Sequence, residues 1–139
     1  MNGDFQSFHE ICPELANTET RGIFNFFNSN FPPGQYYFLE SYCNDKKCDC
    51  RKVMIMVVNK NRPIATIGFG WEDINFYEKW IGDKETAKIM KGPSLELGGI
   101  HSEFANRFLK FFKEKILTDK PYIERIKTHY KIFKTRLRI

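Results

Sequence analysis

Three short apolar runs, separated by polar residues, constrain the fold of this chain more than any other feature of its sequence. The runs cover residues 36–39, 53–58 and 64–69, and their aromatic and β-branched side chains suit a pleated, half-buried surface. Only the polar turn 59–63 joins the second run to the third, and connections this short favour antiparallel pairing. The sequence therefore predicts a small antiparallel three-stranded sheet, which needs helices over one face to be stable.

Helices are predicted on both sides of this sheet. Pro13 stands where a helix can begin, since the missing N–H of proline costs nothing in the first turn. This N-terminal helix is expected to end in the segment 28–34, whose prolines and glycine cannot continue it. Its apolar residues share one face, and they are Leu15, Ile23, Phe26 and Phe27. After the sheet, capping residues and apolar spacing predict three or four helices, at about 74–81, 85–90, 102–116 and from 121 onward. The order of elements predicts an α+β fold.

The composition indicates one domain that spans residues 1–139. Of its 139 residues, 42% are hydrophobic and 16% are aromatic, which is enough for one core. No stretch approaches the ~20 apolar residues that span a bilayer, and the N-terminus lacks the basic start and apolar run of a secretory signal. We therefore expect a cytoplasmic protein with no membrane partner, whose cysteines are thiols or metal ligands rather than disulfides.

Three cysteines lie close together in the sequence, at positions 43, 48 and 50. If the runs on either side pair as a hairpin, Cys43 and Cys50 face each other across its neck, and Cys48 points to the same side as Cys50. Short cysteine spacings at a turn are typical of zinc, which takes four ligands in a tetrahedron. We therefore predict a zinc site built from Cys43, Cys48 and Cys50. Its fourth ligand has to come from a distant residue or from water, and the candidates are His9, Cys12, His101 and His129.

Two other interpretations of the cysteines and of His129 remain open. The cysteines can be ordinary reduced thiols, or a redox group in which neighbouring cations lower a thiol pKa. The cations close to them in the sequence are Lys46, Lys47 and Arg51. His129 lies on the apolar stripe of the last predicted helix, where a hydrogen-bonded core histidine is the alternative to a metal ligand.

The C-terminal third of the chain is basic, although the formal net charge of the whole is only +5. Four of its cations recur at helical spacing and form one stripe, namely Lys127, Lys131, Lys134 and Arg138. Such a stripe is either a solvated helix face or a polyanion-binding surface, where each cation adds an affinity that salt weakens. No base-reading motif accompanies it.

Several segments resemble a family of uncharacterised bacterial proteins. The residues that carry the resemblance are HEICPELANTETR, CDCR, GWE, FYEKW and THY, and they match the family pattern HExxPExxxxETR, CDCR, GWE, YxxW and HY. Some members are fused to the short metal-binding SEC-C motif, and the family has no assigned activity. The resemblance includes His9 and His129 but not Cys12 or His101, so it favours the first two as the fourth zinc ligand. The matched residues are His9, Glu14, Glu19, Arg21, Cys48, Cys50, Arg51, Trp71, Glu72 and His129.

These patterns predict a non-enzymatic bacterial module that is stabilised by zinc and acts by binding a protein or nucleic-acid partner. The alternative is an enzyme of unknown reaction, with a polar site near the cysteine loop. Its acid, base and cation groups would be His9, Glu14, Glu19 and Arg21. An open cleft that holds these four groups favours the enzyme, whereas a closed cysteine site favours the module.

Overall fold

The centre of the molecule is an antiparallel meander of three long strands. The computed structural model describes residues 4–138, and in it β3 (Gly34–Cys43), β4 (Lys52–Asn59) and β5 (Arg62–Gly70) follow one another in space as in sequence. The predicted pairing of the three apolar runs is therefore confirmed. The predicted size of the sheet is wrong, because six strands take part among the described residues.

Two of the additional strands lie on the same edge of the meander. β1 (Phe5–Ser7) pairs with the C-terminal end of β3, and β2 (Arg21–Asn25) pairs with its N-terminal half. At the opposite edge, β6 (Ser94–Leu95) pairs with β5. These short strands occupy backbone donors and acceptors that would otherwise be unpaired along the outer long strands.

The N-terminal helix is shorter than the sequence pattern predicts. It consists of α1 (Phe8–Ile11) and α2 (Pro13–Glu19), and the chain then turns into β2 instead of continuing as a helix. Glycine at position 22 weakens a helix, and in the strand a Cβ there would crowd the Gln35 amide. The edge of β3 therefore decides the conformation of this segment, which local spacing had assigned to a helix.

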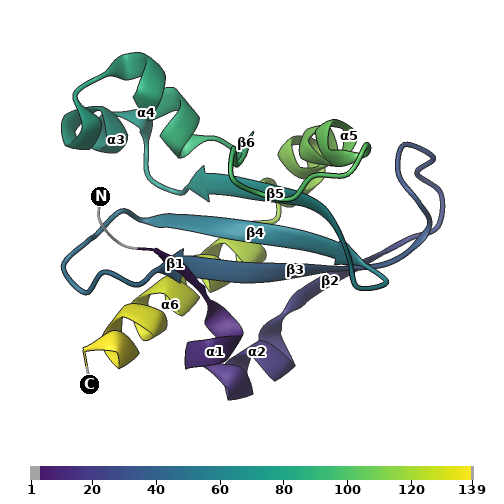
Figure 1. The fold of residues 1–139 in the computed structure, drawn as a ribbon, viewed down its shortest axis with the longest axis horizontal. Coiled ribbons are helices and arrows are strands. Elements are labelled where there is room, and N and C mark those ends of the chain that lie inside the picture. Colours follow the sequence, from purple (N-terminus) through teal and green to yellow (C-terminus); the bar gives the residue numbers. More distant parts are fainter. Residues whose placement is uncertain (1–3, 139) are drawn as a thin grey trace.

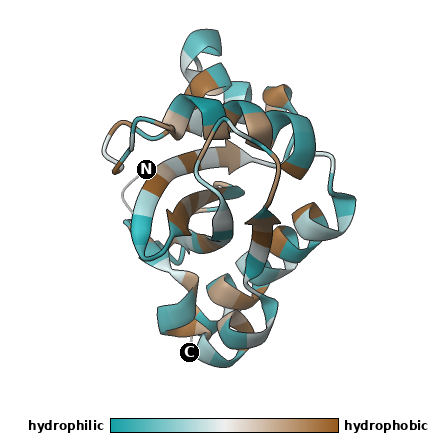
Figure 2. Cartoon of the chain, turned by 90° about the vertical axis from the view of Figure 1, so that its right-hand side faces the viewer, coloured by the Kyte–Doolittle hydropathy of each residue, from teal (hydrophilic) through white to brown (hydrophobic). Residues whose placement is uncertain are grey.

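One face of the meander forms the core. Phe38, Val57 and Ala65 lie side by side on adjacent strands and are fully buried. Aromatic rings from the C-terminal helices cover them, and Phe38 contacts Phe108 and Tyr122. Figure 1 shows α6 crossing one face of the sheet, and Figure 2 shows hydrophobic segments on both the strands and the helices.

The helices after the sheet follow the predicted order. They are α3 (Ile74–Ile81), α4 (Lys84–Lys91), α5 (Ala105–Phe111) with the π-helical turn η1 (Phe112–Ile116), and α6 (Lys120–Leu137). Asp73 caps α3 by accepting from two backbone N–H groups, and Gly82 ends it in a left-handed conformation. Within residues 4–138, no helix combines the length and the apolarity that crossing a membrane requires.

Candidate metal centre and the adjoining groove

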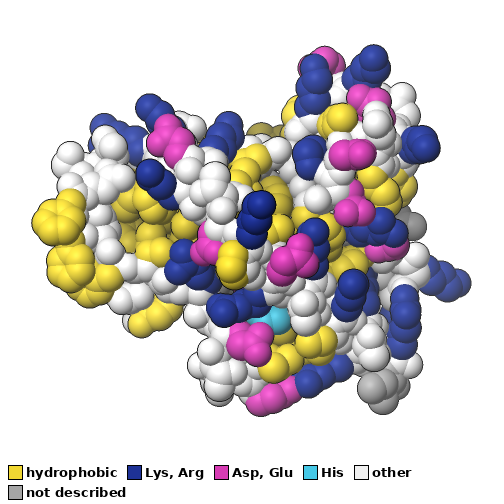
Figure 3. All heavy atoms as spheres, turned by 180° about the vertical axis from the view of Figure 1, so that it is seen from behind, with side chains coloured by type: hydrophobic (Ala, Val, Ile, Leu, Met, Phe, Trp, Pro, Cys, Tyr) yellow, Lys and Arg dark blue, Asp and Glu magenta, His cyan; other side chains and the backbone are white. Residues whose placement is uncertain are grey.

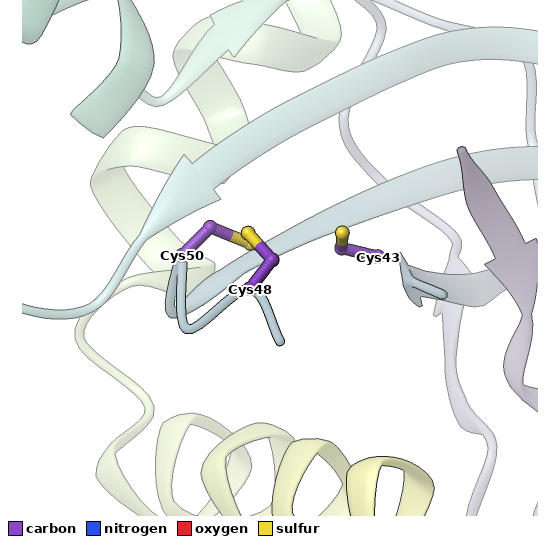
Figure 4. Close-up of side chains that lie close together, drawn as sticks. All are labelled: Cys43, Cys48 and Cys50. Carbon is purple, nitrogen blue, oxygen red and sulfur yellow. The ribbon is translucent and has the colours of Figure 1, made fainter. Parts of the chain in front are cut away.

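The three predicted cysteines converge at the neck of the β3–β4 hairpin. Cys43 is the last residue of β3, while Cys48 and Cys50 lie in the loop that returns to β4. Their sulfurs all lie within 4.8 Å of one another, and Figure 4 shows Cys48 and Cys50 on the loop across from Cys43. Cys43 and Cys50 are fully buried, whereas Cys48 is half-buried. The arrangement can hold a thiophilic metal ion through three thiolates.

Side chains from two helices fix the cysteine loop. The Tyr130 hydroxyl of α6 donates to Asp49 Oδ1 (2.9 Å) and accepts from the backbone N–H of Arg51 (3.3 Å). The Tyr77 hydroxyl of α3 donates to the carbonyl of Arg51 (2.8 Å). Arg51 itself has a positive φ of 49°, which is uncommon for a residue with a side chain. The loop is therefore held by these tertiary contacts in addition to its own turn at Asp45, which accepts from the backbone N–H groups of Lys47 and Cys48.

Segments that carry the family resemblance meet beside this loop. Arg51 of the CDCR segment forms ion pairs with Asp49 (2.9 Å) and with Glu72 of the GWE segment (2.8 Å). Trp71 packs edge-on against Tyr130, the residue after His129, at a centroid distance of 5.0 Å. These motifs are far apart in the sequence but form one structural unit around the hairpin neck.

Burial favours the protonated form of two of the thiols, Cys48 and Cys50. Burial and the adjacent thiols raise the pKa of Cys50 to about 12, and burial raises the pKa of Cys48 despite the nearby ammonium of Lys134. Lys46 and Lys47 are exposed, and Arg51 is occupied by two carboxylates. The redox interpretation requires a lowered thiol pKa, and the shifts of both thiols run in the opposite direction.

The group of converging side chains does not include the predicted histidines. Among residues 4–138, no fourth histidine, cysteine, aspartate or glutamate joins the three sulfurs. Both ring nitrogens of His129 are occupied elsewhere, and His9 lines a separate cavity. His101 contacts the backbone at Thr66 and Glu96. The prediction of His9 or His129 as the fourth ligand is therefore not met by this arrangement.

His129 is instead a hydrogen-bonded core histidine, which confirms the alternative to a metal ligand, and its partners form a buried polar network that the sequence pattern did not indicate. Its Nδ1 lies 2.7 Å from Glu40 Oε1, and its Nε2 lies 2.7 Å from Glu19 Oε1. The Tyr42 hydroxyl donates to the same oxygen of Glu40 (2.6 Å), and the Phe8 ring stacks on the imidazole. The sequence could have indicated that Glu40 is buried, because Glu40 is the one charged residue among the aromatic inward positions of β3.

The charge of this network favours a protonated His129. Burial lowers the pKa of His129, but the hydrogen bonds and negative charges of Glu40 and Glu19 together outweigh it and hold that pKa above its ordinary value. The side chain of His129 is 1% exposed, that of Glu40 is 3% exposed, and that of Glu19 is 39% exposed. An imidazolium therefore joins a buried carboxylate on β3 to a carboxylate at the surface end of α2.

The four groups of the predicted enzyme site are not assembled beside the cysteine loop. Glu14 forms an ion pair with Arg136, Arg21 pairs with Asp119 (2.9 Å), and Glu19 contacts His129. His9 lies at a cavity of about 210 Å³ that Glu40 and His129 also line. Glu14, Arg21 and Glu19 therefore each have a different partner, and His9 lies at a cavity away from the cysteine loop.

A groove runs along α6 beside the cysteine cluster. One cavity of about 290 Å³ is lined by Cys48 and by cations of α6, and a second of about 340 Å³ continues from it toward Trp71. The two cavities share Asp49, Tyr130 and Lys131. In Figure 3, lysine and arginine side chains gather at the lower right, on the side where α6 ends.

The predicted basic stripe borders this groove, with one correction. Lys131 and Arg138 are exposed and Lys127 is half-buried, as a solvent-facing stripe requires. Lys134 is only 6% exposed, and its ammonium donates to the carbonyl of Asp45 (2.9 Å). It therefore points into the cysteine loop instead of the solvent, because α6 lies close enough to that loop to cover its side chain.

No family model, no curated protein and no solved structure matches the chain. The resemblance found in the sequence therefore stays a prediction.

Proposed function

We propose that the protein is a zinc-stabilised bacterial module of the cytoplasm, which binds a polyanionic partner such as a nucleic acid along α6. The observation that carries the proposal is the convergence of three sulfurs within 4.8 Å at the hairpin neck. Three thiolates supply three of the four positions of tetrahedral zinc. The metal would fasten Cys43 at the end of β3 to the loop that α6 holds through Tyr130 and Lys134.

The first test is the metal itself. We expect the purified protein, made without a histidine tag, to contain one zinc per chain by elemental analysis after gel filtration. Ligands gathered only in the folded loop make metal binding a contribution to stability, which is about 4 kcal/mol at a free metal concentration a thousandfold above Kd. A chelator should therefore lower the Tm by on the order of ten degrees.

Cysteine variants separate metal binding from core packing. Cys48→Ser should remove the zinc and abolish the effect of the chelator on the Tm. Cys12→Ser is the control, because Cys12 is a free cysteine that is fully buried in the core but lies outside the cluster. This control should retain both the zinc and its response to the chelator. Wild-type protein that is free of metal and indifferent to a chelator would show that the cysteines are ordinary thiols.

The groove along α6 supports a polyanionic partner. Its walls include Lys127, Lys131 and Arg138, and the acidic side chains that line it, Asp49 and Glu72, are both paired with Arg51. Lys127 forms an ion pair with Glu124 on the same helix (3.2 Å), whereas the exposed Lys131 and Arg138 have no carboxylate partner among the described residues. Phosphate contacts of this type give affinity without base specificity, and salt weakens them.

Charge reversal tests the groove. Lys127→Glu with Lys131→Glu should weaken binding to single-stranded nucleic acid in a fluorescence-anisotropy titration and reduce the salt dependence by about one to two phosphate contacts. The Tm should fall by no more than a few degrees, since neither lysine is buried. The same change at the exposed Lys113 and Lys115 of η1 is the control. An equal loss of nucleic-acid binding in the control would show that net charge alone explains the weakening. Unfolding of the Lys127→Glu, Lys131→Glu variant would show that these lysines are structural.

A further inference from the structure

The cysteine cluster faces solvent on one side only. Cys43 and Cys50 are fully buried, while the half-buried Cys48 lines the cavity of about 290 Å³ beside α6. Within the described chain, no histidine, cysteine or carboxylate supplies a fourth ligand atom to the group. A ligand that completes a tetrahedron around the metal therefore has to approach through this cavity.

The walls of this cavity are positively charged. They contain four cations, which are Lys47, Lys131, Lys134 and Arg138. The one carboxylate among them, Asp49, is already engaged by Arg51 (2.9 Å) and by the Tyr130 hydroxyl (2.9 Å). Any group that enters the cavity therefore meets uncompensated positive charge.

Lys134, one of these four cations, gives a more specific indication that negative charge belongs here, because it is buried. Its side chain is nearly buried, and its ammonium donates to the carbonyl of Asp45 rather than pairing with a carboxylate within the described residues. An unpaired buried charge is costly. Zinc with three thiolates carries one net negative charge, and a fourth anionic ligand adds another, so the occupied centre would supply the missing partner for Lys134.

We propose, on the basis of the zinc centre proposed above, that the fourth ligand is the thiolate of a small thiol that carries carboxylate groups. A centre built from thiolates favours a soft donor, and four thiolates are a common ligand set for zinc. The carboxylates of the ligand would contact Lys131 and Arg138 at the rim. On binding, the thiol loses its proton to solvent, a metal–sulfur bond forms and a water leaves the metal, so that no electron is transferred.

Cobalt substitution makes this step visible. Co²⁺ takes the place of zinc, and its sulfur-to-metal charge-transfer absorbance rises with the number of bound thiolates. Mercaptosuccinate, added after gel filtration of the cobalt protein, should raise this absorbance by about one third, the step from three to four thiolates. The neutral thiol 2-mercaptoethanol should need at least a tenfold higher concentration, and the S-methyl ether of mercaptosuccinate should produce no such rise.

Variants of the rim identify the binding site of the carboxylates. Lys131→Glu with Arg138→Glu should weaken mercaptosuccinate binding at least tenfold and leave the binding of 2-mercaptoethanol within about twofold. Lys113→Glu, far from the cavity walls, should change neither. A cobalt spectrum that already indicates four thiolates or ignores added thiol would overturn this inference while leaving the metal centre in place. An equal spectral change with inorganic phosphate would also overturn this inference. Failure of the protein to bind cobalt or zinc at all would overturn the proposed function as well.

Discussion

Replacing His129 with leucine is expected to reduce the free energy of unfolding by about 3–5 kcal/mol, because the change leaves the Glu40 carboxylate buried without its cationic partner. Glu40 would retain only the hydroxyl of Tyr42, at 2.6 Å. Urea denaturation followed by circular dichroism measures the loss. Since a domain of this kind has roughly 5–15 kcal/mol in total, the variant should be partly unfolded at 37 °C. A loss below about 1 kcal/mol would show that the bridge contributes little.

The matched control removes both partners. In Glu40→Leu with His129→Leu, this network retains no fully buried charge, and replacing a buried ion pair by apolar residues is often neutral. The double variant should therefore be more stable than His129→Leu alone. Glu19→Gln should lower the free energy of unfolding much less than His129→Leu does, because the side chain of Glu19 reaches solvent.

The same network predicts a pH dependence. The folded-state pKa of His129 is raised above its ordinary value, so its contribution to stability is fully present below the unfolded value of about 6.5. This contribution is lost as the pH rises through the folded-state pKa. The difference in stability between the wild type and the double variant should therefore shrink as the pH increases from 6 toward 9, and an increase over that range would contradict the imidazolium bridge.

Replacing Val57 with aspartate is expected to abolish folding. Val57 is fully buried between Phe38 on β3 and Ala65 on β5. An unpaired charge at that position costs several kcal/mol, which is comparable to the whole stability of the domain. Met56→Asp is the control, because Met56 is only half-buried and points to the opposite face of the same strand. Circular dichroism and gel filtration should show an unfolded chain for the first variant and a folded one for the second.

The sequence predicted the structure correctly where residues close together along the chain determine it. Residues 53–58 and 64–69 pair as neighbouring antiparallel strands because the turn between them is short. Asp73 and Gly82 bound α3, and the stripe Tyr122, Ile126 and Phe133 is buried on α6. In each case, the residues that determine the structure lie within a few positions of one another.

The sequence did not predict the structure correctly where a residue contacts another that is distant along the chain. The spacing of Ile23 and Phe26 fits a helix, but the edge of β3 draws residues 21–25 into a strand. Lys134 has helical spacing with the exposed cations, yet the cysteine loop covers it. His129 was identified as important, but its partners Glu40 and Glu19 lie 89 and 110 residues away in the sequence.

The sequence by itself determined the central meander, the order of the helices and the meeting of Cys43, Cys48 and Cys50, whose positions follow from the neck of one hairpin. The tertiary structure alone decided which side chains face those sulfurs and which carboxylates receive His129. The physical reason is that backbone pairing and cysteine convergence need only neighbours along the chain. The charge balance of a buried group, by contrast, depends on whatever elements pack against it. In this protein α6 is that element, because it brings Lys134 to the cysteine loop and His129 to Glu40.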